Sequence, residues 1–316
     1  MSFADRSRSR STFSVLLALV AAGCAAHGAT APGVASTPPG GAARAALLAA
    51  DDALASALGA RPPAAAFGPF LAADVVFGLP AADLVHGKEA ALALLAPPPL
   101  AATVTAWHRV AGAISEDGRE GYTFGWLHRT NAGGAATFGK YLAVWRVEAE
   151  GWRVEAFLWR TAKRAPTTPP PDSDVVAGYR GSPAPGDAGA LTRSVLAADA
   201  EFAALSLAKG YGIAFARYAD SRAICFTNGD FQWGPAGVRD VFGGWSPEEE
   251  LSWVPKAGRA AASGDLAWTA GFATMTVGTG ASATRAYSNY LTIWARQPDG
   301  SWRWLLEADN SRPTRP

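Results

Sequence analysis

The last part of the chain repeats a segment that occurs earlier in the sequence. Residues 290–304 read YLTIWARQPDGSWRW, and residues 141–154, some 149 positions before, read YLAVWRVEAEGWRV. Each segment has Tyr-Leu, a Trp four residues after the Tyr, a short polar turn and a Trp-Arg pair. A repeat of this kind indicates two copies of one structural unit.

The similarity extends along two blocks of 122 residues, 43–164 and 191–312. Ala-Ala-Asp at 49–51 pairs with Ala-Ala-Asp at 197–199, and the segments 70–74 and 115–118 pair with 218–220 and 263–265. The offsets stay near 148 to 150 in the same order along the chain. We therefore expect a tandem duplication, with each block of a size usual for one domain.

Segments rich in small residues, Pro and Gly bound these blocks. Residues 25–42 are rich in Ala, Gly, Pro and Thr without periodicity, which predicts a flexible tether. Residues 165–190 are dense in Pro and Gly, which break helices and strands, and this predicts a linker. The expected organisation is a leader at 1–24, the tether, a first domain at 43–164, the linker, and a second domain at 191–316.

Residues 1–24 have the pattern of an export signal. Three arginines precede the apolar run FSVLLALVAA at 13–22, which is too short to span a bilayer comfortably as a mature helix. Ala-Ala-Gly-Cys at 21–24 resembles the lipobox of bacterial lipoproteins, which implies that Cys24 carries lipid. No Asp follows at Ala25 or Ala26, so we expect an outer-membrane anchor facing the periplasm. The alternative is an uncleaved anchor, or secretion with an incidental cysteine.

Charge and cysteine content exclude several classes of function. The 28 Lys and Arg nearly balance the 27 Asp and Glu, and there is no basic run, which argues against nucleic-acid binding. Cys225 is the only other cysteine, and its apolar surroundings predict a small buried side chain. The hydrophobic content of 49%, with 12 Trp, is enough to fill real cores.

Both blocks follow one order of predicted elements. Helical patterns at 43–58 and 191–209 are followed by a short helix that ends near Asp74 or Asp220. Strand-like runs then follow, at 74–79, 103–114, 120–129, 138–147 and 151–159, and at 223–227, 251–262, 266–277, 286–296 and 301–308. Helices followed by an antiparallel-rich half predict an α+β fold.

This order, with a small helix near 87–95 or 237–241 and a closing hairpin YLTIW…DGSWRW…EAD, resembles the nuclear-transport-factor-2-like superfamily, nearest its SnoaL-like domains. The resemblance covers both blocks. It implies two tandem cones, each a strongly bent sheet wrapped around its N-terminal helices, often with a ligand pocket at the open end. It also implies that cones pair through their sheets, either within the chain or in a homodimer.

The resemblance includes the ketosteroid isomerases, whose chemistry needs a carboxylate base and a Tyr that stabilises an oxyanion. Alignment on Asp220 places the Tyr position at Phe202 and near Leu54. The base position falls near Thr227-Asn228 and near Phe77-Gly78. Neither block keeps either group, so we expect no isomerase of this type.

Other catalytic or metal chemistry has little support in the sequence. The second block contains no histidine, and His86, His108 and His128 of the first block lack ligand spacing. We expect no cofactor and no metal, and we assign no catalytic residue.

The closing strand of the second block carries polar candidates. Strict alternation along 302–309 places Trp302, Trp304 and Leu306 on one face and Glu307 and Asp309 on the other, where the two acids can form a polar spot at the mouth of the cone. The alternative is that they are rim residues, exposed to water or paired with Arg303 or Arg285. The full set of expected ligand-binding residues is Trp233, Trp268, Asn289, Glu307, Asp309 and Asp230 in the second block, and Trp107, Trp126, Lys140, Glu155 and His86 in the first.

Three hypotheses on function remain open at this stage. The leading one is a lipid-anchored envelope protein whose cones bind a small, partly apolar molecule without turning it over. The second is an enzyme of the same fold that uses a non-standard pair such as Glu307 and Asp309. The third is a scaffold whose Trp-rich cones are filled by their own side chains and pack through their sheets.

Overall fold

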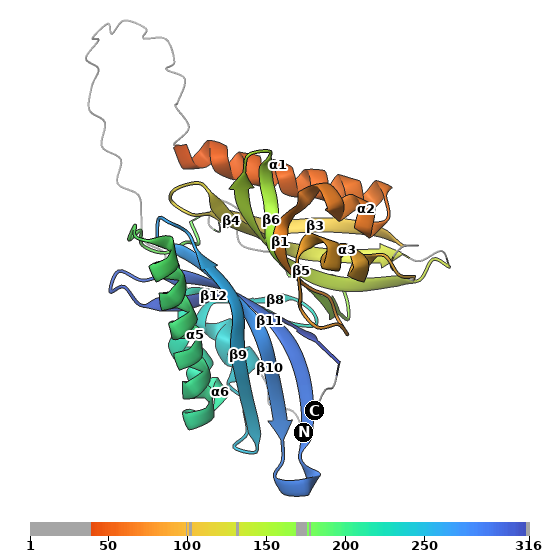
Figure 1. The fold of residues 1–316 in the computed structure, drawn as a ribbon. Helices are drawn as coiled ribbons and strands as arrows, with labels where there is room; N and C mark the ends of the chain where they lie inside the picture. Colours follow the sequence, from red (N-terminus) through yellow and green to blue (C-terminus); the bar gives the residue numbers. More distant parts are fainter. Residues whose placement is uncertain are drawn as a thin grey trace, which may run out of the picture. The chain divides into compact units, whose positions relative to one another are not determined.

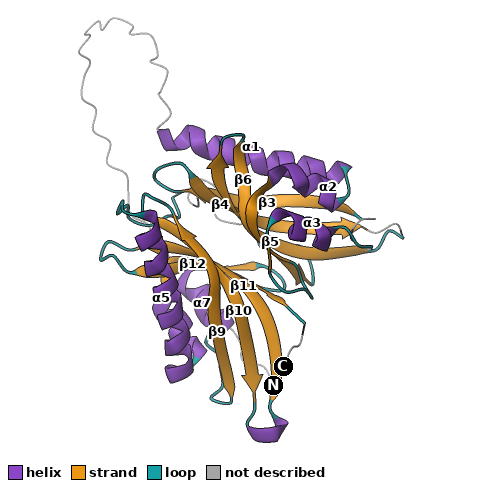
Figure 2. Cartoon of the chain, viewed as in Figure 1, coloured by secondary structure: helices purple, strands orange, loops and turns teal. Residues whose placement is uncertain are grey.

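The structure, a computed structural model, describes residues 39–98, 100, 103–130, 133–168, 176 and 178–313. It contains two similar units, the first cone (residues 39–162) and the second cone (residues 188–311). In each cone helices come first and a six-stranded sheet is built mainly from the residues that follow (Figures 1 and 2). The predicted α+β class with two tandem cones is confirmed.

The first cone contains α1 (Pro39–Ala60), α2 (Pro63–Phe67), β1 (Leu71–Gly78), β2 (Val85–His86), α3 (Lys88–Leu95), β3 (Val104–Ile114), β4 (Glu120–Thr130), β5 (Ala136–Glu148) and β6 (Gly151–Ala162). Its strand order is β2-β1-β6-β5-β4-β3. Only β1 and β6 pair in parallel; the other neighbours are antiparallel.

The second cone repeats this plan with α5 (Ala188–Lys209), α6 (Tyr211–Tyr218), β7 (Ala219–Phe226), β8 (Phe231–Trp233), α7 (Gly234–Phe242), β9 (Glu249–Ala260), β10 (Leu266–Val277), β11 (Thr284–Arg296) and β12 (Trp302–Ser311). Its strand order, β8-β7-β12-β11-β10-β9, is that of the first sheet element for element. The turn predicted at 298–300 joins β11 to β12, and Gly300 has the positive φ that this turn needs.

Three boundaries differ from the sequence predictions. Helix α1 begins at Pro39, inside the predicted tether, because a proline is compatible with the first turn of a helix. Helix α5 begins at Ala188, inside the predicted linker, because the Asp187 carboxylate caps it by accepting from the Ala190 N–H. Strand β7 begins at Ala219, four residues before its predicted start, so it includes Asp220.

The described part of the linker is bound to the second sheet. Backbone hydrogen bonds join Gly181 N–H to the Asp265 carbonyl at 3.0 Å and Ser182 N–H to the Arg296 carbonyl at 2.7 Å. The Tyr122 hydroxyl of the first cone donates to the Tyr179 carbonyl at 2.8 Å. This segment therefore connects to both cones.

A buried polar network occurs in the same place in each cone. Asp51 lies on the apolar stripe of α1, and its carboxylate accepts from Trp107 Nε1 at 3.3 Å, Thr123 Oγ1 at 2.8 Å and Tyr141 OH at 3.3 Å. Trp145 Nε1 in turn donates to Thr123 Oγ1 at 2.8 Å. Burial raises the pKa of Asp51, and the hydrogen bonds oppose that shift.

In the second cone Asp199 takes the same role on α5. Its carboxylate accepts from Trp253 Nε1 and from Tyr290 OH, each at 2.8 Å, and Trp294 Nε1 donates to Thr269 Oγ1 at 2.8 Å. Glycine at position 271 leaves room for the Tyr290 ring, because a Cβ atom on residue 271 would lie only 2.9 Å from that ring. Both helices are thus fixed to their sheets through one buried carboxylate.

The outer faces of the two sheets pack on each other and form one hydrophobic core. Phe124 on β4 lies 5.5 Å from Phe231 and 6.0 Å from Phe226, between ring centroids. The polar contacts are reciprocal: Lys140 Nζ donates to the Asp230 carbonyl, and the equivalent Asn289 donates to the Ala82 carbonyl. Such reciprocity is the mark of a two-fold interface, here within one chain.

We predict that Asp51→Ala lowers the free energy of unfolding by about 2–4 kcal/mol, because three buried donors then lack an acceptor. Asp52→Ala is the matched control. That neighbouring side chain is 65% exposed and paired with Arg109, so its loss should cost less than about 1 kcal/mol. Urea unfolding followed by Trp fluorescence measures both variants, and equal effects would contradict the structural role of Asp51.

Candidate functional site

An open cavity of about 420 Å³ lies in the second cone, between its sheet and helices α5, α6 and α7. This size falls in the range of small-molecule sites, about 300–1,000 Å³. Much of its wall is aromatic or aliphatic, formed by residues that include Phe202, Tyr211, Phe215, Phe242, Leu251 and Trp253. Polar groups come from β11 and β12 and include Tyr290, Thr292, Glu307, Asp309 and Ser311.

A β-bulge in β12 aims the two acids into this cavity. Trp294 faces Trp304 across β11 and β12, but Ile293 faces Leu306, so Leu305 is the extra residue. Alternation shifts by one beyond it, so Glu307 and Asp309 line the helix side of the sheet, where Trp302 and Trp304 also pack. The sequence prediction of opposite faces was wrong for this reason.

The two carboxylates have different partners. Asp309 accepts from Arg160 Nη1 at 2.7 Å, and this arginine comes from β6 of the first cone. Among the described residues, no hydrogen bond or ion pair reaches the Glu307 carboxyl. Burial raises the pKa of Glu307 to about 8, the Asp309 charge adds to the rise, and Arg160 opposes it. Glu307 is therefore largely protonated at neutral pH.

The first cone is filled at the same positions. Asp309 of the second cone corresponds to Trp159 of the first, because they pair with the equivalent residues Tyr290 and Tyr141. In the same way Glu307 corresponds to Phe157, because they pair with Thr292 and Ala143. Leu127 likewise stands where the second cone has Ala273. A cavity of only about 20 Å³ remains beside Leu127, Phe157 and Trp159. Three large side chains thus fill the first cone where the second one is open.

Of the expected ligand residues, the structure brings only Glu307 and Asp309 to the cavity. Trp268, Trp233 and Asn289 lie on the other side of the second sheet, toward the first cone. Trp268 Nε1 donates to Glu155 at 2.9 Å, the Trp233 ring is 6.2 Å from that of Phe124, and Asn289 bonds the 82–84 loop.

Asp230 and Lys140 also take part in structural contacts. The Asp230 carboxylate accepts from Arg164 at 2.7 Å and from the backbone of Thr167 and Thr168, and Arg164 is the main cause of its lowered pKa. The Lys140 side chain is fully buried, with Nζ 4.1 Å from the centroid of the Phe231 ring. Burial lowers the pKa of Lys140 to about 7.

The remaining first-cone candidates are dispersed. Trp107 is a core residue bonded to Asp51, and Trp126 stacks on His108 at 3.9 Å between centroids. His86 is exposed in β2. Cys24 lies outside the described residues, and Cys225 is buried as predicted.

Sequence reasoning missed most of the cavity, including Asp199, Phe202, Trp253 and Tyr290 as lining groups. A usable signal existed for Asp199, because an Asp interrupts the apolar stripe of both first helices at equivalent positions. No signal of this kind distinguishes an aromatic residue that lines a cavity from one that fills a core.

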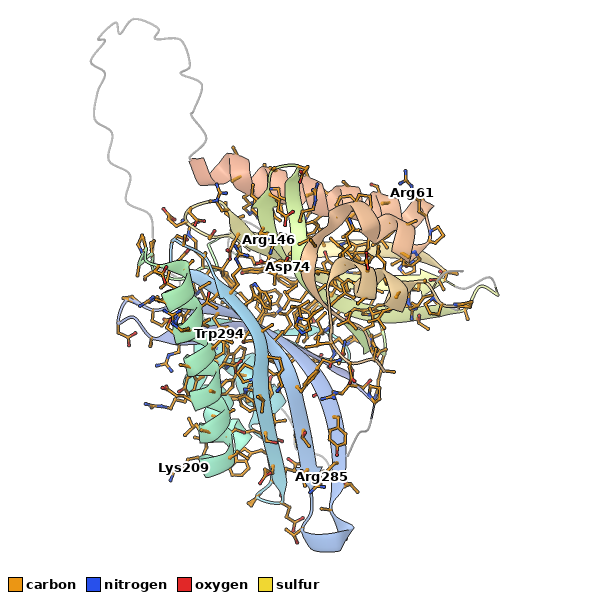
Figure 3. The ribbon with its side chains drawn as sticks, in the orientation of Figure 1. Arg61, Asp74, Arg146, Lys209, Arg285 and Trp294 are labelled. Atoms are coloured by element: carbon orange, nitrogen blue, oxygen red, sulfur yellow. The ribbon has the colours of Figure 1, made fainter. Side chains whose placement is uncertain are left out.

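Glu155, the bulge residue equivalent to Leu305, lies in a charged cluster at the sheet interface. Arg259 Nε lies 3.0 Å from Glu120, while Arg259 Nη1 and Arg146 Nη1 each lie 3.6 Å from Glu155. Arg146 also pairs with Asp74 at 2.6 Å, and the two side chains point toward each other in Figure 3. Burial raises the pKa of Glu155.

No metal-ligating cluster of three or more His, Cys, Asp or Glu occurs in the described part of the chain. Across the same residues, every helix is too short or too polar to cross a membrane.

Known structures similar to this chain match about one cone. An NTF2-like protein of unknown function from Pseudomonas putida KT2440 has 14% identity and a TM-score of 0.33, over 40% of this chain and 89% of its own. The CaMKII hub of S. rosetta has 17% identity and a TM-score of 0.32, over 38% of this chain and 95% of its own. A Δ5-3-ketosteroid isomerase from Mycobacterium sp. has 18% identity and a TM-score of 0.30, over 36% of this chain and 91% of its own.

At these values the similarities carry no conclusion about activity. No family model matches the sequence, and no match was found among curated proteins. The element order and sheet topology of each half are those expected of a nuclear-transport-factor-2-like cone. The described residues form two cones of this topology, one filled and one open.

The interface glutamates predict a pH dependence of stability. Burial and the Glu155 charge raise the pKa of Glu120 from 4.5 to about 8. Between these values the folded protein holds a proton that the unfolded chain has released, so stability falls as pH rises, by up to about 1.4 kcal/mol per pH unit.

We expect Glu120→Gln to flatten the fall between pH 5 and pH 8, since the amide does not titrate. Glu89→Gln, at an exposed position on α3, should leave the slope unchanged. Unfolding in urea across this range measures both variants, and a slope that Glu120→Gln leaves intact would contradict the proton assignment.

Proposed function

We propose that the second cone binds one small, partly apolar molecule by non-covalent contacts in its cavity. The observation that carries this proposal is the difference between equivalent positions of two copies of one fold. Ala273, Glu307 and Asp309 open the second cone where Leu127, Phe157 and Trp159 fill the first.

The difference has an energetic cost that packing alone does not explain. An unfilled apolar cavity loses packing energy, on the order of 24 cal/mol per Å³ in core truncations. Placing Glu307 on this apolar wall without a side-chain partner costs further desolvation energy. The first cone shows that the same scaffold accepts large side chains here, so the open form supports a binding role.

The first cone acts as a support in this proposal. Its own cavity is filled, and it contributes Arg160, which fixes the Asp309 carboxylate at the edge of the binding site. The same arginine donates to the Phe226 carbonyl at 2.6 Å, which joins it to β7 as well. The scaffold hypothesis therefore fits the first cone, and the ligand hypothesis fits the second.

One observation favours acid–base catalysis as a second candidate function. Glu307, with a pKa of about 8, is positioned beside Asp309, which is paired with a guanidinium. A carboxyl that titrates near neutral pH can give and take a proton at low cost. Turnover would require a substrate whose reacting atom lies within hydrogen-bond reach of Glu307.

We also propose that the mature protein is anchored in the bacterial envelope by lipid on Cys24. The supporting pattern is the basic start, the apolar run at 13–22 and Ala-Ala-Gly-Cys at 21–24. The cones would then lie in the periplasm, held at the outer membrane.

The binding proposal predicts that some apolar compounds of a small-molecule set quench Trp fluorescence, because Trp253 lines the cavity. Ala273→Leu fills the cavity with the residue of the first cone and should weaken binding by at least about tenfold, about 1.4 kcal/mol. Ala200→Leu, exposed on α5, is the control. Binding by Ala273→Leu at wild-type strength, or no response to any compound, would contradict the proposal.

The anchoring proposal predicts that Cys24→Ser moves the protein out of the membrane fraction, or stalls it with its leader uncut. Cys225→Ser should leave the fractionation unchanged, because that buried thiol is remote from the leader in sequence. Mass spectrometry of the mature N-terminus reads the acyl group directly. A membrane fraction that Cys24→Ser leaves unaltered, with an intact leader in both proteins, would refute lipid anchoring.

A further inference from the structure

The acidic and basic side chains on the cavity wall of the second cone are all carboxylic acids. Its described lining residues include three carboxylic acids, Asp199, Glu307 and Asp309, and contain no Lys, Arg or His. Asp199 is already satisfied by Trp253 Nε1 and Tyr290 OH. Asp309 shares its charge with Arg160 from outside the cavity. Glu307 is the acid that is left without a partner among the described residues.

Aromatic rings surround the same space. Phe202 lies 4.8 Å from Phe215 and 4.5 Å from Trp253, and Phe215 stacks on Phe242 at 3.9 Å, all between ring centroids. Tyr211, Tyr287 and Tyr290 add three more rings to the wall. Faces of aromatic rings attract cations, most strongly where water is excluded.

We infer that the ligand of the second cone is an organic cation, a protonated amine or quaternary ammonium on an apolar body, with its charge at Glu307 and Asp309. This inference rests on the proposed binding function and narrows it to one ligand class. An anionic ligand would meet three carboxylic acids and no basic side chain among the lining residues. A purely apolar one would displace water from the Glu307 carboxyl without giving it a hydrogen-bond partner.

The charge state of Glu307 should make the affinity for a cation depend on pH, which distinguishes a cationic ligand from a neutral one. The charged and titratable groups around it are Asp309 on its own strand, Arg160 from β6, Cys225 on β7, and, across the cavity, Asp199 on α5, Tyr290 on β11 and Tyr211 on α6. Glu249 on β9 is engaged by Tyr211 OH at 2.6 Å.

A bound cation favours ionised Glu307, so binding releases a proton at neutral pH. Affinity should therefore rise with pH until Glu307 is ionised in the free protein, near pH 8. A quaternary ammonium keeps its charge at every pH, which assigns any pH effect to the protein.

The test uses the whole chain and three probes of similar size: benzyltrimethylammonium, the neutral 3-phenylpropan-1-ol and the anionic 3-phenylpropanoate. We expect the cation to bind at least about tenfold more tightly than either of the others at pH 8. Its affinity should increase at least about tenfold from pH 6 to pH 9, while that of the alcohol stays flat. Trp fluorescence titration and calorimetry give the constants.

Glu307→Gln should remove most of the preference for the cation and its pH dependence, while binding of the alcohol persists. Glu250→Gln, exposed at the start of β9, is the matched control and should behave as wild type. Thermal unfolding checks that each variant is folded. If Glu307→Gln does not fold, Asp309→Asn tests the site through the second carboxylate.

The outcomes separate the two claims. If the alcohol or the acid binds as tightly as the cation, the inference on ligand class is overturned while the binding function stands. If the cation is preferred but Glu307→Gln and Asp309→Asn leave that preference intact, the assigned site is overturned. If none of the three probes binds, the inference on ligand class is overturned, and the binding function is contradicted only if the wider small-molecule set also gives no response.

Discussion

Each sheet of this protein has two apolar faces, and its own helices cover only one of them. The other face is covered by the second sheet, which yields a core shared by residues such as Phe124 and Trp268. The paired positions Lys140 and Asn289 make reciprocal contacts, as in a two-fold dimer. Because this packing holds the outer faces, the space between sheet and helices is free to differ between the cones.

Inside each cone one buried carboxylate joins the first helix to the sheet, and in the second cone it also borders the cavity. Asp199 ties α5 to β9 and β11 while one side of it lines the cavity. Asp51 likewise ties α1 to its sheet, but Phe157 and Trp159 fill the space beside it. In the function that we propose, the two copies have separate roles: the first supports the second and extends Arg160 to the acid pair of the cone that stays open.

The sequence was sufficient to predict the duplication, the α+β class and the order of elements, because periodicity and turn residues are local signals. It could not place Glu307 and Asp309 on the same face as Trp302 and Trp304, since the face of a residue beyond a bulge depends on the register with the neighbouring strand. Trp268 and Trp233 were assigned to a pocket for a related reason. Strand tryptophans have the same pattern on either face of a sheet that is covered on both.

We propose that one cone is a binding site, whereas the other is filled by its own side chains. Diffraction from crystals grown with benzyltrimethylammonium tests this most directly. We expect density for one cation between Glu307 and the rings of Trp253 and Phe215, with Phe157 and Trp159 filling the first cone. A second cone closed by its own side chains, or a cation bound elsewhere, would contradict it.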